Sequence, residues 1–139
     1  MPKCVVMKGD ATNGDLVVYW CPGCRSRHSV RVQKSAGIPS PSWEWNGSLD
    51  NPTITPSVHY TPGRCHHFVQ DGWINYCGDC SDHSLGGKVV RLSDVDADGV
   101  LAGALYEPLS DADAEAFRRG EHARLLQSIV VKPQPDTES

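Results

Sequence analysis

The chain has 139 residues, a formal net charge of −4, 13 glycines and 10 prolines. This length fits one domain, and this composition favours turns and short strands over long helices. The acidic balance argues against electrostatic binding to nucleic acid, and no stretch of about 18 apolar residues is present to cross a membrane. The apolar part of the N-terminus is too short for a signal peptide, so we expect a cytoplasmic protein.

Alternating and β-branched residues predict an antiparallel β domain over residues 1–109. Asp71-Gly72 predicts a tight hairpin turn within it. Trp43 and Trp45 would share one face of an extended segment, and we expect them to cap the core, with a platform for a partner as the alternative. The predicted strands cover residues 4–8, 15–20, 29–33, 52–60, 64–69, 73–76 and 88–92.

One helix is predicted, at about residues 111–128. Ser110 can cap its first turn, where Asp111 and Asp113 are favoured by the helix dipole. We expect residues 110–131 to hold this helix, packed on the β domain or extending from it, and residues 132–139 to form a polar tail. The expected fold class is mainly β: a small antiparallel, zinc-ribbon-like sheet with one C-terminal helix.

Two Cys-x-x-Cys pairs predict a metal site. The Pro-Gly turn between Cys21 and Cys24 aims two thiols at one point, which supplies half of a tetrahedral zinc site. Cys77 and Cys80 repeat the spacing, and the two pairs together form the pattern of a zinc ribbon. In a reducing compartment, closely paired cysteines indicate a metal more than disulfides. Four thiolates would hold Zn²⁺ as a closed, structural site.

A second ligand set competes with the ribbon pairing. Cys65 with His66, or with His67 on the same face of a strand, could supply the other half of the site. A single zinc is favoured over two, and the sequence leaves open which four ligands bind it. The candidate metal ligands are Cys21, Cys24, Cys65, Cys77, Cys80, His66 and His83.

Five motifs in a fixed order carry a resemblance that spans roughly residues 16–92. They are Trp20-Cys21-Pro22-Gly23-Cys24, Trp45-Asn46-Gly47, Asn51-Pro52-Thr53-Ile54-Thr55-Pro56-Ser57, Arg64-Cys65-His66-His67-Phe68-Val69-Gln70-Asp71-Gly72 and Asp79-Cys80-Ser81-Asp82-His83-Ser84-Leu85-Gly86-Gly87-Lys88. The chain resembles an uncharacterised, zinc-knuckle-like family of small phage and prophage proteins, sometimes mislabelled ammonia monooxygenase. The resemblance implies metal binding by the Cys21–Cys24 pair, Cys65, His66 and His83. Because the family usually has an apolar residue at the position of Cys77, it favours Cys65 over the plain ribbon pairing.

The resemblance and the thiol-rich turns favour a non-enzymatic function, although the sequence leaves enzymatic activity open. We expect a zinc-stabilised phage protein that binds another protein, either as a virion component or as a factor in the host cytoplasm. The alternative is a small zinc-dependent hydrolase, with Asp71, Asp79 or Asp82 as its general base. The monooxygenase label does not fit, because thiolate-rich turns suit zinc better than an oxygen-activating copper site.

Overall fold

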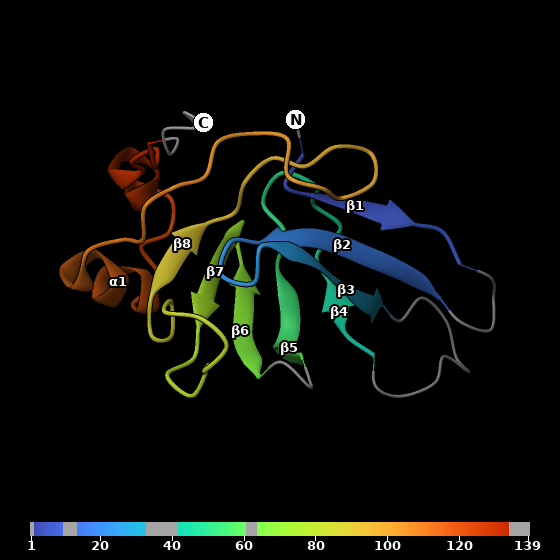
Figure 1. Ribbon diagram of the computed structural model, residues 1–139, viewed down its shortest axis with the longest axis horizontal. Helices are drawn as coiled ribbons and strands as arrows, with labels where there is room; N and C mark the ends of the chain where they lie inside the picture. The colour runs from blue at the N-terminus through green and yellow to red at the C-terminus, as the bar shows by residue number, and fades with distance from the viewer. Residues whose placement is uncertain (1, 10–13, 33–41, 61–63, 134–139) are drawn as a thin grey trace, which may run out of the picture.

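The computed structural model describes residues 2–9, 14–32, 42–60 and 64–133, which form two antiparallel sheets (Figure 1). The strand order is β1-β2-β3 in the first sheet and β4-β5-β6-β7-β8 in the second. The predicted mainly-β class with a C-terminal helix is confirmed, although two sheets replace the single ribbon-like sheet. The strands are β1 (Cys4–Met7), β2 (Asp15–Cys21), β3 (Ser26–Val32), β4 (Glu44–Trp45), β5 (Ile54–Tyr60), β6 (Cys65–Gln70), β7 (Trp73–Tyr76) and β8 (Val89–Arg91).

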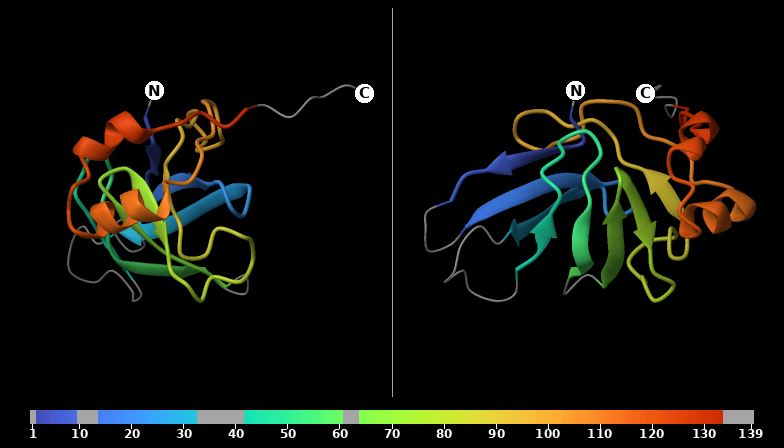
Figure 2. Two further views of the ribbon diagram at one scale, coloured as in Figure 1. Left: turned by 90° about the vertical axis from the view of Figure 1, so that its left-hand side faces the viewer. Right: turned by 180° about the vertical axis from the view of Figure 1, so that it is seen from behind.

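The apolar faces of the two sheets pack against each other. Val17 of β2 pairs with Val30 of β3, and Val69 of β6 pairs with Ile74 of β7. All four side chains are buried in one core cluster that draws on both sheets. Figures 1 and 2 show β2 and β3 running across the strands of the second sheet, so the β domain is a two-layered sandwich.

The hairpin between β6 and β7 follows the sequence prediction. Gln70 pairs with Trp73, which leaves Asp71 and Gly72 as a two-residue loop. Both loop residues have positive φ, 51° and 82°, as a type I′ turn requires. This turn fixes the register of β6, the strand from which the candidate site is built.

The C-terminal helices cover the outer face of the second sheet at β7 and β8. Trp73 and Val89 point away from the main core and join α1 (Asp111–Arg118) and the 3-10 helix η1 (Arg124–Ser128) in a second apolar cluster. The Ser110 hydroxyl caps α1 by accepting a hydrogen bond from the Asp113 N–H at 3.2 Å. The predicted single helix is interrupted after residue 118, where Gly120 adopts a φ of +94°.

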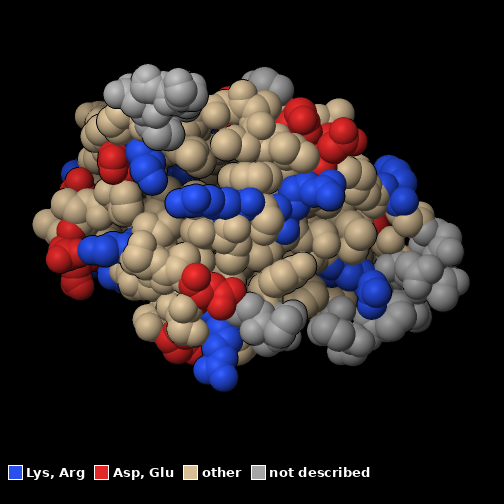
Figure 3. All heavy atoms as spheres, in the orientation of Figure 1, with Lys and Arg blue, Asp and Glu red and all other residues tan. Residues whose placement is uncertain are grey.

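The outer face of β5 and β6 stays open beside this helical cover. Phe68, which points outward from β6, is 37% exposed, and His59 of β5 is also exposed. Figure 3 shows one face of the molecule, on which Lys and Arg form a row across the middle and Asp and Glu lie around it. No helix among the described residues is long and apolar enough to cross a membrane.

The predicted division into residues 1–109, 110–131 and 132–139 stays a prediction. Residues 134–139 of the predicted tail lie outside the described residues, as does the segment 33–41.

Candidate functional site

Three polar side chains meet on the open outer face of the second sheet. Ser57 lies in β5, within the register shift between Ile54 and Val58, where a β-bulge interrupts the pairing with β6. His66 follows the buried Cys65 on β6, so alternation turns its side chain outward. Asp79 lies in the turn after β7. A bulge re-aims side chains locally, which explains how Ser57 comes to face His66.

The three side chains form a linear hydrogen-bonded chain. His66 Nε2 lies 3.1 Å from the Ser57 hydroxyl, and His66 Nδ1 lies 3.0 and 3.2 Å from the two carboxylate oxygens of Asp79. Because an ionised carboxylate only accepts, Nδ1 carries the proton and Nε2 is the acceptor for the Ser57 hydroxyl. This is the order of nucleophile, base and orienting acid found in serine hydrolases of unrelated folds.

Backbone and side-chain contacts hold this triad in place. Trp43 donates its indole N–H to the Ser57 carbonyl at 3.1 Å, and the Cys77 N–H donates to the His66 carbonyl at 2.9 Å. The imidazole rings of His59 and His66 stack with their centroids 4.8 Å apart. Trp43 and Trp45 are half-buried and pack against the core, as the sequence predicted.

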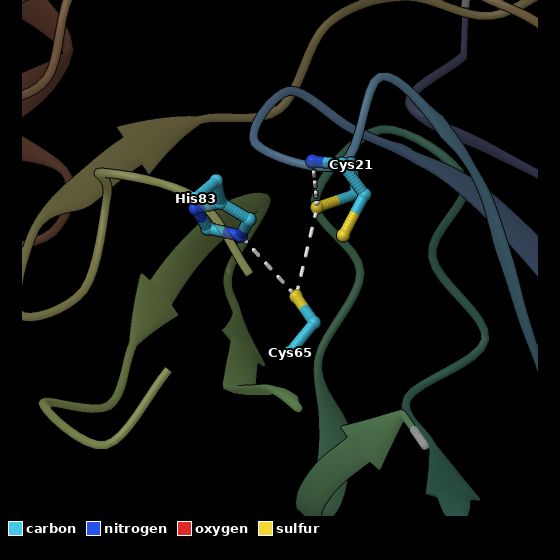
Figure 4. A group of neighbouring side chains, drawn as sticks. Cys21, Cys65 and His83 are labelled. Atoms are coloured by element: carbon cyan, nitrogen blue, oxygen red, sulfur yellow. Dashed lines mark hydrogen bonds between the residues drawn. The ribbon is translucent and has the colours of Figure 1, made fainter. Parts of the chain in front are cut away.

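A cluster of thiols and one imidazole lies behind the triad, on the inner side of the sheet. One ligand atom from each of its members lies within 4.8 Å of all the others: Cys21, Cys24, Cys65 and His83. Figure 4 shows the Cys65 side chain facing both Cys21 and His83. The Cys65 Sγ lies 3.8 Å from the Cys21 Sγ and 3.5 Å from the His83 Nε2. Tetrahedral zinc would place two thiolates about 3.8 Å apart and a thiolate and an imidazole nitrogen about 3.5 Å apart. The donor set and its spacing therefore fit a metal ion.

Cys80 is a fifth donor at the edge of this cluster, with its Sγ 3.5 Å from His83 Nε2. Tyr76 supports the cluster by placing its hydroxyl 3.1 Å from the Cys21 Sγ and by accepting the Gly23 N–H at 3.2 Å. A Cβ at position 23 would lie only 2.3 Å from the His83 ring, so the Cys-Pro-Gly-Cys turn needs glycine there. The turn predicted from sequence thus leaves room for a ligand from elsewhere in the chain.

The thiols of the inner cluster shift one another's pKa values strongly. A hydrogen bond from Cys65 lowers the pKa of the Cys21 thiol to about 2, while burial raises the pKa of Cys24 to about 12. The pKa of Cys65 is raised, chiefly because its proton is held by Cys21. Several buried thiolates cannot coexist without a compensating positive charge. A bound divalent cation is the natural source of that charge.

The triad and the thiol cluster share two segments of the chain. Cys65 and His66 are neighbours on β6 that face opposite sides of the sheet, and Asp79 immediately precedes Cys80. Contacts that hold the buried cysteines in place therefore also hold the backbone that carries His66 and Asp79.

Two further groups of possible ligands lie near the main cluster. His66, Cys77 and Asp79 form a separate group whose ligand atoms lie within 4.8 Å of one another. His28 and His67 form a buried group with Cys65. Burial lowers the pKa of His67 to about 3, so this imidazole is neutral. The ribbon pairing of four cysteines is not the arrangement in the structure, because Cys77 points toward His66.

Ser57 is the candidate functional residue that the sequence did not reveal. Its motif was noted for the resemblance, but a serine after proline carries no signature of a nucleophile. Asp79 was named only as a possible base for a metal-bound water, and His66 only as a ligand. Triads have no common spacing along the sequence, so geometry is what identifies them.

Comparison with known proteins adds one finding. A family model described as "Bacterial ubiquitination-like system serine protease (BubE)" matches residues 1–77, more than half of the chain. The matched part includes Ser57 and His66, whereas Asp79 and His83 lie beyond it. No curated protein and no solved structure matches the chain.

This match corrects the function expected from sequence. The prediction of a non-enzymatic phage protein, acting as a virion component or host-directed factor, is wrong, because the matching family is described as a serine protease of a bacterial system. The structure gives the physical reason: His66, expected only as a metal ligand, is hydrogen-bonded to Ser57 and Asp79. The alternative of a zinc-dependent hydrolase also differs from a serine protease, which uses a hydroxyl as its nucleophile.

Proposed function

Because the chain belongs to the bacterial ubiquitination-like system serine protease (BubE) family, we propose that it hydrolyses peptide bonds with Ser57 as nucleophile. The observation that carries the proposal is the hydrogen-bonded chain from Ser57 through His66 to Asp79. In this assignment His66 is the general base and Asp79 holds its ring in the productive tautomer.

Each residue has a defined task in the reaction. The Ser57 Oγ attacks the carbonyl carbon of the substrate while His66 Nε2, at 3.1 Å, takes the hydroxyl proton. His66 then gives this proton to the leaving amine, and the acyl group remains on Ser57 as an ester. A water molecule deprotonated by His66 hydrolyses that ester and regenerates the serine. The carboxylate of Asp79 stabilises the imidazolium that forms in both steps.

We assign a structural role to the metal that the inner cluster would hold. Cys21, Cys24, Cys65 and His83 would be its ligands, with Cys80 as the alternative fourth donor, and zinc is the ion that suits them. Four protein ligands leave no open position, so the metal supplies no water for catalysis. Its contribution is to tie the turn after β2 to β6 and to the segment around Asp79.

The family description names a ubiquitination-like system as the setting. We propose that the substrate is a protein of such a system, recognised at the open outer face of β5 and β6. None of the six cysteines is in a disulfide, which supports a reducing compartment such as the bacterial cytoplasm.

A peptidase assay with matched variants tests the proposal. The wild-type protein, Ser57→Ala and His66→Gln are compared on an unstructured protein such as casein, with zinc content and near-ultraviolet circular dichroism measured on each. We expect activity in the wild type and its loss in both variants while zinc content and fold are retained. Equal activity in Ser57→Ala and wild type would overturn the assignment.

A further inference from the structure

We propose that a second zinc ion binds directly to the catalytic base, at a site formed by His66, Cys77 and Asp79, and blocks it. This inference rests on the proposed serine protease function. One ligand atom of each residue lies within 4.8 Å of the other two. An imidazole nitrogen, a thiolate and a carboxylate are the three donor types that zinc takes in proteins, and a water molecule would complete the tetrahedron.

The Cys77 thiol is the third donor of the group that contains His66 and Asp79. Cys77 follows β7 directly, and its N–H donates to the His66 carbonyl at 2.9 Å, which holds the two residues side by side across the sheet. Cys77 belongs neither to the triad nor to the group of Cys21, Cys24, Cys65 and His83. The reaction of the triad does not use the Cys77 thiol, so catalysis gives no reason for a thiol beside His66.

The site is reachable from solvent, unlike the inner cluster. The Asp79 side chain is 66% exposed, and Cys77 and His66 are only half-buried. The two metal sites share no ligand, because Cys65 and His66 face opposite sides of β6. Added zinc can therefore reach the outer site while the inner one keeps its own ion.

Zinc at this position would stop catalysis by changing the tautomer of His66. In the active form the ring proton is on Nδ1, facing Asp79, and Nε2 accepts the Ser57 proton. A metal on Nδ1 leaves the single ring proton on Nε2, and the Cys77 thiol proton is released to solvent. Nε2 then has no lone pair for the Ser57 proton, so the serine is no longer activated. Removing the zinc restores the original tautomer.

The experiment uses protein that carries its structural metal as purified. The rate at which a fluorophosphonate probe labels Ser57 is measured at increasing concentrations of added zinc. Each variant is compared with its own rate without added zinc. Removing a direct ligand should weaken zinc affinity by at least the roughly 10–100-fold seen for second-shell partners. Cys77→Ala should therefore need at least about tenfold more zinc for half-inhibition than wild type. Cys4→Ala, which removes a buried thiol that belongs to none of the ligand groups, is the matched control and should behave as wild type.

A binding measurement keeps this inference separate from the proposed function. Calorimetric titration with zinc should show one further equivalent bound by wild type and by Ser57→Ala, with the affinity lowered in Cys77→Ala. If Ser57 is never labelled, the serine protease assignment fails while calorimetry still decides the metal site. Equal zinc inhibition of Cys77→Ala and wild type, or no further equivalent in the titration, would overturn the inference.

Discussion

Replacing Asp79 by Asn tests how the triad orients His66. Asp79 accepts from His66 Nδ1 at 3.0 Å and would stabilise the imidazolium formed as Ser57 attacks. Two unit charges about 4 Å apart attract by about 1 kcal/mol in water and by about 4 kcal/mol at an effective dielectric constant of about 20. Because the Asp79 side chain is 66% exposed, water screens this attraction, and we expect a loss of about 1–3 kcal/mol. That corresponds to a roughly 5- to 150-fold drop in kcat/KM, less than the about 10⁴-fold loss in kcat of a buried triad.

The assay is the initial rate of cleavage of a fluorogenic peptide, measured below KM. Asp82→Asn, which neutralises an exposed carboxylate three residues further along, is the control and should leave the rate close to wild type. A rate for Asp79→Asn within twofold of wild type, together with an inactive Ser57→Ala, would refute the orienting role of Asp79. An equal loss of activity in Asp82→Asn would show that the rate depends only on the negative charge of this segment and not on the contact between Asp79 and His66.

Three further predictions concern the metal, the serine backbone and the helix. Cys65→Ser should lower zinc occupancy more than Cys77→Ser does when both variants are analysed for metal as purified, because Cys65 lies in the four-donor inner cluster; the opposite ranking would restore the ribbon pairing. Trp43→Phe removes the indole donor to the Ser57 carbonyl and should reduce kcat/KM about 2- to 10-fold through loss of one hydrogen bond. The same change at Trp45, whose indole bonds elsewhere, should have a smaller effect, and equal effects would count against a positioning role. Ser110→Ala should lower the free energy of unfolding by about 1 kcal/mol in a denaturant titration, and no change would mean that the cap is dispensable.

The strands were predictable because their side chains alternate. Val17 and Tyr19 of β2, and Val30 and Val32 of β3, point inward at every second position and are all buried. The arrangement of the strands was not predictable in the same way. Two sheets form because residues far apart in sequence share one core, and a local pattern does not specify such pairing. The helix was placed correctly at Ser110, but Gly120 ends its regular part early.

The inner cluster was partly predictable and the triad was not. The Cys21–Cys24 turn has a local signature, and the family resemblance pointed to Cys65 and His83 as its companions. Ser57 reaches His66 only because a bulge shifts the register of β5; Pro56 indicates an edge strand or a bulge in this strand, but not which side chain the bulge turns toward His66. His66 was assigned to the metal because it adjoins Cys65 and the family resemblance pairs the two residues, although strand alternation places it on the opposite face.

The site of covalent modification by a fluorophosphonate tests the central claim most directly. These probes react with an activated serine hydroxyl and not with an ordinary one. The protein is labelled as purified, with its structural metal and without added zinc, then digested and sequenced by mass spectrometry, with His66→Gln treated in parallel. We expect one adduct, on Ser57, in the wild type and none in His66→Gln. An unlabelled wild-type protein, or a single adduct on another serine, would contradict it.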